Sequence, residues 1–186
     1  MITSDATPGL HSVGLRPRQV EREPAALLLE CHQRIRDFCS LARRLTEPGT
    51  PDDITAEAAR CVHRYFTEAL PLHATDEDET LEPRLRGRSL ELDAALDRMR
   101  REHQSHQPLV VRLCELTRVL AAAPAELAGL AAELSTVALQ LEGELLDHIE
   151  HEERTIIPAI AEYLPPRARE SIVAQFAARR HVVPRR

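Results

Sequence analysis

A motif that occurs twice limits what this chain can fold into. Each copy reads His, three residues, Glu, five residues, Pro, and the two copies are His73, Glu77, Pro83 and His148, Glu152, Pro158. A separation of four residues places the His and the Glu on the same face of an α-helix, one turn apart. Each copy therefore predicts a helix that directs an imidazole and a carboxylate to one point. Two such helices facing each other in a bundle supply most of a two-metal site.

Each copy of the motif is preceded by another histidine at a similar distance. His32 lies 41 residues before His73, and His103 lies 45 residues before His148. The chain therefore divides into two similar halves, each with an upstream His and a later His-x-x-x-Glu. A single His-x-x-x-Glu is common by chance, but the repetition of the whole array indicates that these residues form one site.

The apolar pattern around these motifs is helical. Apolar side chains recur every three or four residues in four segments, at about residues 24–46, 55–83, 90–121 and 125–163, and a shorter helix is expected at about 167–180. Glycine is scarce, with 6 residues, whereas Ala, Leu, Glu and Arg, which form helices readily, are abundant. Short connections favour antiparallel neighbours. We therefore predict an all-α fold, an antiparallel up-down-up-down four-helix bundle with a short C-terminal helix.

We expect one domain with a flanking segment at each end. Residues 1–23 are polar and rich in Pro and Gly, and they are predicted to form an N-terminal tail. The bundle is assigned to residues 24–163, and the short C-terminal helix and tail to residues 164–186. Within the bundle, Pro71 should kink or loosen the second helix, and Pro108 should interrupt the third.

Charge and composition argue against several classes of partner. The net charge is −6, every basic side chain is Arg, and no basic stripe is interleaved with aromatic residues, which make up 3% of the chain. Nucleic acid is therefore not an expected partner. The N-terminal segment lacks the apolar region of a signal peptide, and no apolar stretch has the length of a membrane span. We expect a cytoplasmic protein without a membrane partner.

The cysteines do not form a recognisable redox or zinc motif. Cys31, Cys39, Cys61 and Cys114 are scattered, without a Cys-x-x-Cys pair. In a reducing compartment such cysteines are usually small buried apolar residues. Cys31 is the one that merits a closer look, because it directly precedes His32.

Every candidate ligand occupies a position that the periodicity assigns to the apolar core. A single His on such a face is usually a hydrogen-bonded core residue, but four of them with two Glu require another explanation. An unpaired buried carboxylate is very costly, and bound cations would neutralise Glu77 and Glu152. Imidazole and carboxylate without thiolate suit iron, manganese or zinc. Neither the Glu-x-x-His of ferritin-like sites nor the His-Glu-x-x-His of zinc proteases occurs.

These motifs resemble those of the hemerythrin-like proteins, the HHE cation-binding family. The resemblance rests on LLECHQRI around His32, LPLH with Glu77 behind it, MRREHQSH around His103 and LLDHIEHEE around His148, and it covers about residues 24–163. It implies a non-heme centre of two iron ions inside the bundle. By that resemblance one iron is ligated by His32 and His73, the other by His103 and His148, and the bridging carboxylates are Glu77 and Glu152.

The chain departs from the oxygen-carrying hemerythrins of invertebrates in two ways. Those proteins have a second His four residues after the first on the third helix, where this chain has Gln107, and His106 stands three residues after His103 instead. They also place the final carboxylate five residues after its His, and here the separation is four. Both departures fit bacterial members of the family. They count against reversible oxygen carriage, because a missing fifth His leaves an extra exchangeable coordination position. His106 remains a candidate fifth ligand.

The other histidines are interpreted as bystanders. His63 precedes His73 by ten residues, which places it ~80° from the ligand face of a helix that turns ~100° per residue. His151 points off the ligand stripe, and His11 and His181 are assigned to tails. Candidates for groups that support the ligands are Tyr65, Tyr163 and Glu153, among which the sequence does not select.

The resemblance leaves three functions open. The first is a protein that binds or senses dioxygen or a related small ligand such as nitric oxide or peroxide, and a sensing output would need a protein partner that the sequence does not identify. The second is an enzyme, a di-iron oxidase, peroxidase or oxygenase, whose organic substrate would need a pocket beside the metals. The third is iron storage or handling. A family resemblance defines the site better than the task.

Overall fold

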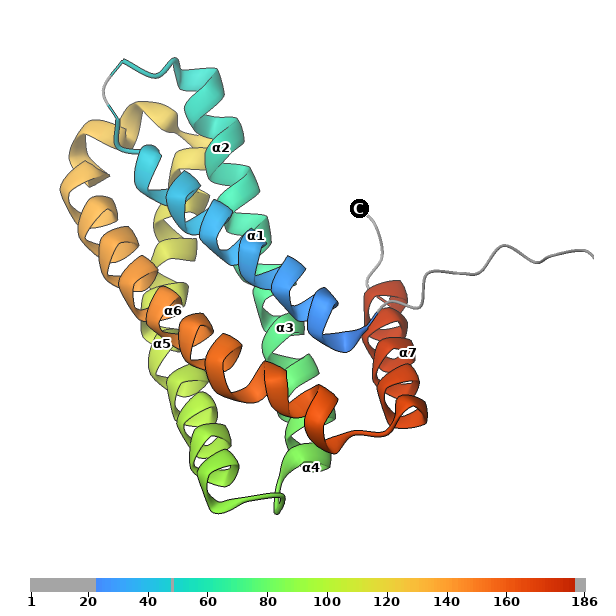
Figure 1. Cartoon of the computed structure of the whole chain (residues 1–186). Helices are drawn as coiled ribbons and strands as arrows, with labels where there is room; N and C mark the ends of the chain where they lie inside the picture. The colour runs from blue at the N-terminus through green and yellow to red at the C-terminus, as the bar shows by residue number, and fades with distance from the viewer. Residues whose placement is uncertain (1–22, 48, 183–186) are drawn as a thin grey trace, which may run out of the picture.

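The computed structural model describes residues 23–47 and 49–182. All regular structure in this part of the chain is helical, and four long helical segments form the predicted antiparallel up-down-up-down bundle, with a shorter helix at the C-terminus (Figure 1). Residues 1–22, which contain most of the predicted N-terminal tail and His11, lie outside the described residues. No described helix has both the length and the apolar character that crossing a membrane would require.

Three of the long segments are single α-helices and one is composite. The single helices are α1 (Pro24–Arg44), α5 (Leu90–Ala122) and α6 (Leu127–Tyr163), the last preceded by a 3-10 turn, η3 (Pro124–Glu126). The composite segment consists of α2 (Asp52–Arg64), η1 (Tyr65–Ala69), α3 (Leu70–Asp76), η2 (Glu77–Leu81) and α4 (Glu82–Leu85). The shorter C-terminal helix is α7 (Pro166–Val182). Helix α5 packs against both α2 and α6, and α1 packs against α6.

Two π turns distinguish the composite segment from the other three. In η1 the Leu70 N–H donates to the Tyr65 carbonyl, five residues earlier. The next residue is Pro71, which has no N–H and whose ring crowds the carbonyl four residues before it. Turn η2 precedes Pro83 in the same way. The predicted loosening at Pro71 is therefore confirmed, in the form of a π turn.

The prediction that Pro108 interrupts the third helix is wrong. Helix α5 continues through Pro108, and α6 continues through Pro158. Both prolines are exposed, so the carbonyl groups that lose their helical partner can bond to water instead. A proline on the solvent-facing side of a helix is thus compatible with uninterrupted α-helix.

Two apolar cores fill the bundle, one toward each end. The first core includes the buried side chains Ile35, Phe66, Leu113, Leu141 and Leu145. The second includes Leu28, Leu81, Leu96, Met99 and Ile156, together with Ile172 and Phe176 of α7. The C-terminal helix therefore completes the second core.

The change from one core to the other occurs at a polar layer. Along α1, Leu28 belongs to the second core and Ile35 to the first, and His32 lies between them. Along α6, Leu145 and Ile156 bracket the second motif in the same way. The repeated motif thus occupies the middle of the bundle, sealed by apolar side chains on both sides.

Candidate metal centre

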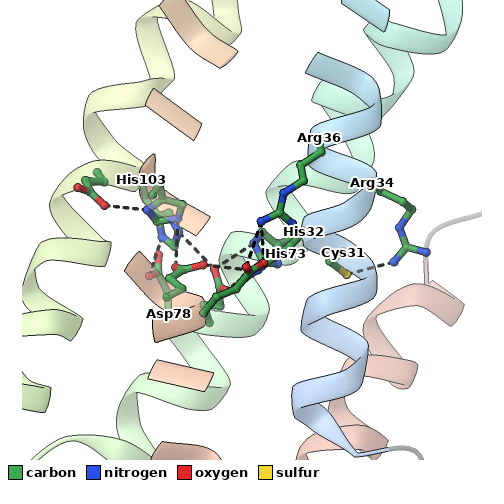
Figure 2. A network of polar contacts seen from close by, with 12 residues as sticks. Cys31, His32, Arg34, Arg36, His73, Asp78 and His103 are labelled. Atoms are coloured by element: carbon green, nitrogen blue, oxygen red, sulfur yellow. Dashed lines mark hydrogen bonds and ion pairs between the residues drawn. The ribbon is translucent and has the colours of Figure 1, made fainter. Parts of the chain in front are cut away.

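The six predicted ligands lie together in this polar layer (Figure 2). They come from all four long segments, with His32 on α1, His73 on α3, Glu77 at the start of η2, His103 on α5, and His148 and Glu152 on α6. Five of the six residues are at most 3% exposed, and the side chain of His103 is 11% exposed. Each lies on the core-facing stripe of its helix, as the periodicity predicts.

The first group of ligand atoms comes from His32, His73, Glu77 and Glu152, and its atoms lie within 4.8 Å of one another. The His32 Nε2 is 3.2 Å from Oε2 of Glu152 and 3.9 Å from Oε1 of Glu77. The His73 Nε2 is 3.4 Å from Oε2 of Glu77. Two imidazoles and two carboxylates therefore converge on one point.

The second group comes from Glu77, His103, His148 and Glu152, within the same distance. The His103 Nε2 is 3.3 Å from Oε2 of Glu77, and the His148 Nε2 is 3.1 Å from Oε1 of Glu152. Both carboxylates belong to both groups. Glu152 directs Oε2 toward His32 of the first group and Oε1 toward His148 of the second, so its carboxylate spans the two groups.

Most atoms that face this point have no hydrogen-bond partner in the described part of the chain. They are the Nε2 atoms of His32, His73 and His103, Oε2 of Glu77 and both oxygens of Glu152. Buried polar atoms are normally paired, because an unsatisfied one costs about 1–3 kcal/mol. A pair of cations would satisfy all of them, since these nitrogen and oxygen atoms are metal-ligand types. The residues present therefore fit two metal ions.

Without a metal, the electrostatics of this layer favour protonated imidazoles beside ionised carboxylates. Burial lowers the pKa of His32, but the Glu152 and Glu77 carboxylates outweigh burial and raise it to about 10. Burial likewise lowers the pKa of His103, and Asp78 and Glu77 raise it to about 10. At Glu77, burial favours the neutral acid, but the imidazoles, His73 foremost, hold the pKa of the carboxyl well below its usual range. A metal ion must therefore displace protons when it binds.

Three of the four ligand histidines have a carboxylate at the second ring nitrogen. The Nδ1 atoms lie 3.0 Å from Glu153 for His32, 3.1 Å from Asp78 for His103 and 2.9 Å from Glu102 for His148. A carboxylate in this place accepts the Nδ1 proton and fixes the ring, which leaves Nε2 available to a metal.

Of these three carboxylates, Glu153 was an unselected candidate from the sequence, and Asp78 and Glu102 were not predicted. Asp78 directly follows Glu77, and Glu153 directly follows Glu152, so each copy of the repeated motif has a second acid directly after its Glu. Each of these acids bonds to the upstream His of the other half of the chain. Glu102 does not follow a motif Glu, and its only signal in the sequence is its position directly before His103.

His73 is the exception among the four. Its Nδ1 has no hydrogen-bond partner among residues 23–47 and 49–182, and the Cys31 thiol is its neighbour. Cys31 directly precedes His32, just as Glu102 precedes the upstream His of the second half. Burial raises the pKa of the Cys31 thiol, but His73 and Arg34, whose guanidinium lies 3.1 Å from the sulfur, outweigh burial and lower it to about 7 (Figure 2). A thiol thus stands where the other half has a carboxylate.

The remaining histidines lie outside both ligand groups. His106, the candidate fifth ligand, is 5% exposed, and its ring centroid is 5.3 Å from that of His148. Burial lowers the pKa of His106, and His148 lowers it further, to about 4. His181 lies near the end of α7, and His151 is half-buried on α6. Two further candidates, Tyr65 and Tyr163, make no hydrogen bond to a ligand histidine within the described ranges.

A cavity of about 380 Å³ lies beside the ligand groups. Its lining includes His73, His103 and His148, and also His106 and His63. His63, interpreted as a bystander, belongs to neither ligand group. Its Nδ1 lies 3.0 Å from the Cys114 carbonyl oxygen of α5, and the side chain forms part of the cavity wall.

Comparison with known proteins gives one family. The profile of the hemerythrin HHE cation binding domain matches residues 23–160. That range contains all six predicted ligands, both π turns and most of α6. No curated protein matches the chain. Because the match covers well over half of the sequence, the chain belongs to the hemerythrin HHE cation-binding domain family.

Proposed function

We propose that the protein holds a dinuclear non-heme iron centre and binds dioxygen or a related small ligand, such as nitric oxide or peroxide, at that centre. The observation that supports the proposal is that both buried carboxylates belong to both histidine groups. Bound iron would supply redox-active coordination positions for the small ligand. One ion would be held by His32 and His73, the other by His103 and His148, and the bridges would be Glu77 and Glu152.

The chain's own residues prepare this site in two ways. The two apolar cores exclude water from the layer of ligands, which strengthens every electrostatic interaction within it. The outer carboxylates of Glu153, Asp78 and Glu102 orient three imidazoles. We propose His106 as a neighbour of the second group and not as a fifth ligand, because its nitrogen atoms belong to neither group.

The cavity favours a second candidate function. An enzyme that oxidises an organic molecule needs a space for that molecule next to the metals, and three ligand histidines line a cavity within the usual size range of ligand pockets. A diatomic ligand alone occupies much less space than this volume. The second candidate is therefore a di-iron oxidase or oxygenase with an organic substrate.

Stopped-flow spectroscopy of the reduced, iron-loaded protein separates these functions. A stable adduct with dioxygen that reverses when oxygen is removed supports ligand binding. Rapid oxidation of the centre, faster with an organic substrate present, supports the oxidase. If the reduced protein neither forms an adduct nor oxidises on mixing, or if metal analysis gives fewer than two ions per chain, the proposal fails.

A further inference from the structure

The cavity beside the ligand groups is elongated. On α5 its lining recurs every three or four residues from His103 to Arg118, and on the opposite wall it extends from His63 to Ala74. The 15 residues between His103 and Arg118 correspond to about 22 Å of helix. The cavity therefore follows the seam between the composite segment and α5, from the polar layer toward one end of the bundle.

The walls of the cavity are apolar. Between its two ends the lining side chains are mostly aliphatic or aromatic, among them Ile35, Phe66, Leu70, Val110 and Leu145. An elongated space with apolar walls suits a single aliphatic chain better than a compact ring system.

The two ends of the cavity differ in exposure and charge. At the inner end, His73 and His148 are 3% and 2% exposed. At the outer end Arg118 is exposed, and within the described ranges it makes no ion pair with an acidic side chain. Glu115, which also lines this end, is paired with Arg112 at 2.7 Å and makes no ion pair with Arg118. The outer end of the cavity thus carries a guanidinium that is free to pair with an anion, and the inner end is made of imidazoles.

We infer that the cavity binds the anion of a straight-chain aliphatic carboxylic acid. The carboxylate pairs with the Arg118 guanidinium, a geometry that favours two parallel hydrogen bonds, and the chain lies along the apolar walls. The far end of the chain then reaches His73, His103 and His148. The placement of that end beside a metal rests on the proposed function, whereas binding in the cavity does not.

Calorimetric titration tests the contact between the aliphatic chain and the apolar walls. The iron-loaded, full-length protein is titrated with octanoate, decanoate and dodecanoate, each below its micelle concentration. Each added methylene should strengthen binding about two- to fourfold, because it removes more apolar surface from water. Val111→Trp, at a position that lines the cavity and is 53% exposed, should weaken dodecanoate binding at least tenfold. Leu139→Trp is the matched control, since Leu139 is 57% exposed on α6 outside the cavity, and it should bind as the unchanged protein does.

The head group is tested with Arg118→Gln and with dodecanol. Arg118→Gln should weaken dodecanoate binding about three- to tenfold and leave dodecanol binding unchanged, because an exposed ion pair contributes modestly. Arg101→Gln, at an exposed position on the same helix outside the lining, should change neither. Equal affinity for dodecanoate and dodecanol, or equal weakening by both Arg variants, would overturn the assignment of an acid.

Metal analysis of the same samples keeps the two proposals apart. Binding of dodecanoate by a protein with fewer than two irons per chain would contradict the proposed function and leave the cavity site standing. Two irons per chain without dodecanoate binding, or binding that Val111→Trp does not weaken, would overturn the cavity site alone.

Discussion

The two halves of the ligand layer differ at one position that the internal repeat makes comparable. In the second half, Glu102 lies directly before the upstream His and its carboxylate is 2.9 Å from Nδ1 of His148. In the first half Cys31 has that place, beside His73, whose Nδ1 has no hydrogen-bond partner in the described part of the chain. The repeated ligands fix where the imidazoles lie, and the residue before each upstream His decides how firmly a ring in the same half is held.

The halves also differ in their access to the cavity. Both histidines of the second group, His103 and His148, line it, but of the first group only His73 does so, and His32 is 0% exposed. An external ligand that enters through the cavity therefore meets two imidazoles of the second group. We expect the second half to be the one at which small molecules exchange.

The largest effect should come from the residues that the halves share. Glu152→Ala should abolish the dinuclear centre, because its carboxylate faces both groups, whereas His32→Ala removes a ligand from the first group alone and should leave one ion per chain. Metal content per chain after reconstitution with iron measures both. Two ions in the Glu152 variant would contradict the shared role, and equal loss in both variants would mean that the halves are not separable.

Removal of the metals should have the next largest effect, which is a loss of stability. A metal present at about a thousandfold excess over its dissociation constant adds about 4 kcal/mol to the free energy of unfolding, or roughly 10 °C in melting temperature for a chain of this size. The metal-free protein should stay helical, because the two apolar cores do not include the ligands. Thermal melting followed by circular dichroism, with and without a chelator, checks this. Equal melting temperatures would show that the six residues do not hold metal in the native state.

The difference between Glu102 and Cys31 should appear in metal affinity. Glu102→Gln should weaken it roughly 10–100-fold, as loss of an orienting carboxylate does at other metal sites. Cys31→Ser should change it less than about threefold, because a thiol is a weak hydrogen-bonding group. Competition with a chromogenic chelator measures both constants. A Cys31 variant as impaired as the Glu102 variant would show that the thiol orients His73 as strongly as the carboxylate orients its partner.

Metal binding should strengthen as the pH rises, by at least tenfold between pH 7 and pH 8. In the metal-free protein the raised pKa values of His32 and His103, about 10, and of His148, about 9, keep these imidazoles protonated at pH 7. Each must lose its proton to bind a metal, so a higher pH lowers the cost of that loss. Zinc affinities measured at pH 7 and at pH 8 test the direction of this change. An affinity that is the same at both pH values would indicate that the imidazoles are already neutral at pH 7.

The sequence could predict that the six side chains gather in one layer, because that information is local. His-x-x-x-Glu places both groups on one helix face whatever the rest of the chain does, and the apolar stripe says which face is buried. Of the carboxylates at Nδ1, Glu153 was one of three unselected candidates, and Asp78 and Glu102 were not predicted, because each reaches a His on another helix. That pairing depends on how each helix is rotated in the bundle, which no spacing within one helix reveals.

The cavity was beyond prediction for a similar reason. Its volume depends on the separation of two helices, and the position of His63 in its wall depends on how α2 is rotated against α5. Pro71 and Pro83 accompany π turns, whereas Pro108 and Pro158 lie in continuous α-helix. A proline inside a helical pattern therefore does not reveal by itself whether the helix is altered.

The π turns also bear on how this chain is aligned with its relatives. Each turn holds one more residue than an α-helical turn does, so it acts as an insertion inside a helix and not in a loop. Comparison with a relative that lacks η1 would require a gap within the composite segment, where gaps are usually disfavoured. Deleting a residue there would rotate everything downstream, including His73, away from the layer of ligands. The distance from an upstream His to its motif, 41 residues in one half and 45 in the other, is therefore a poor ruler for finding such sites in other chains.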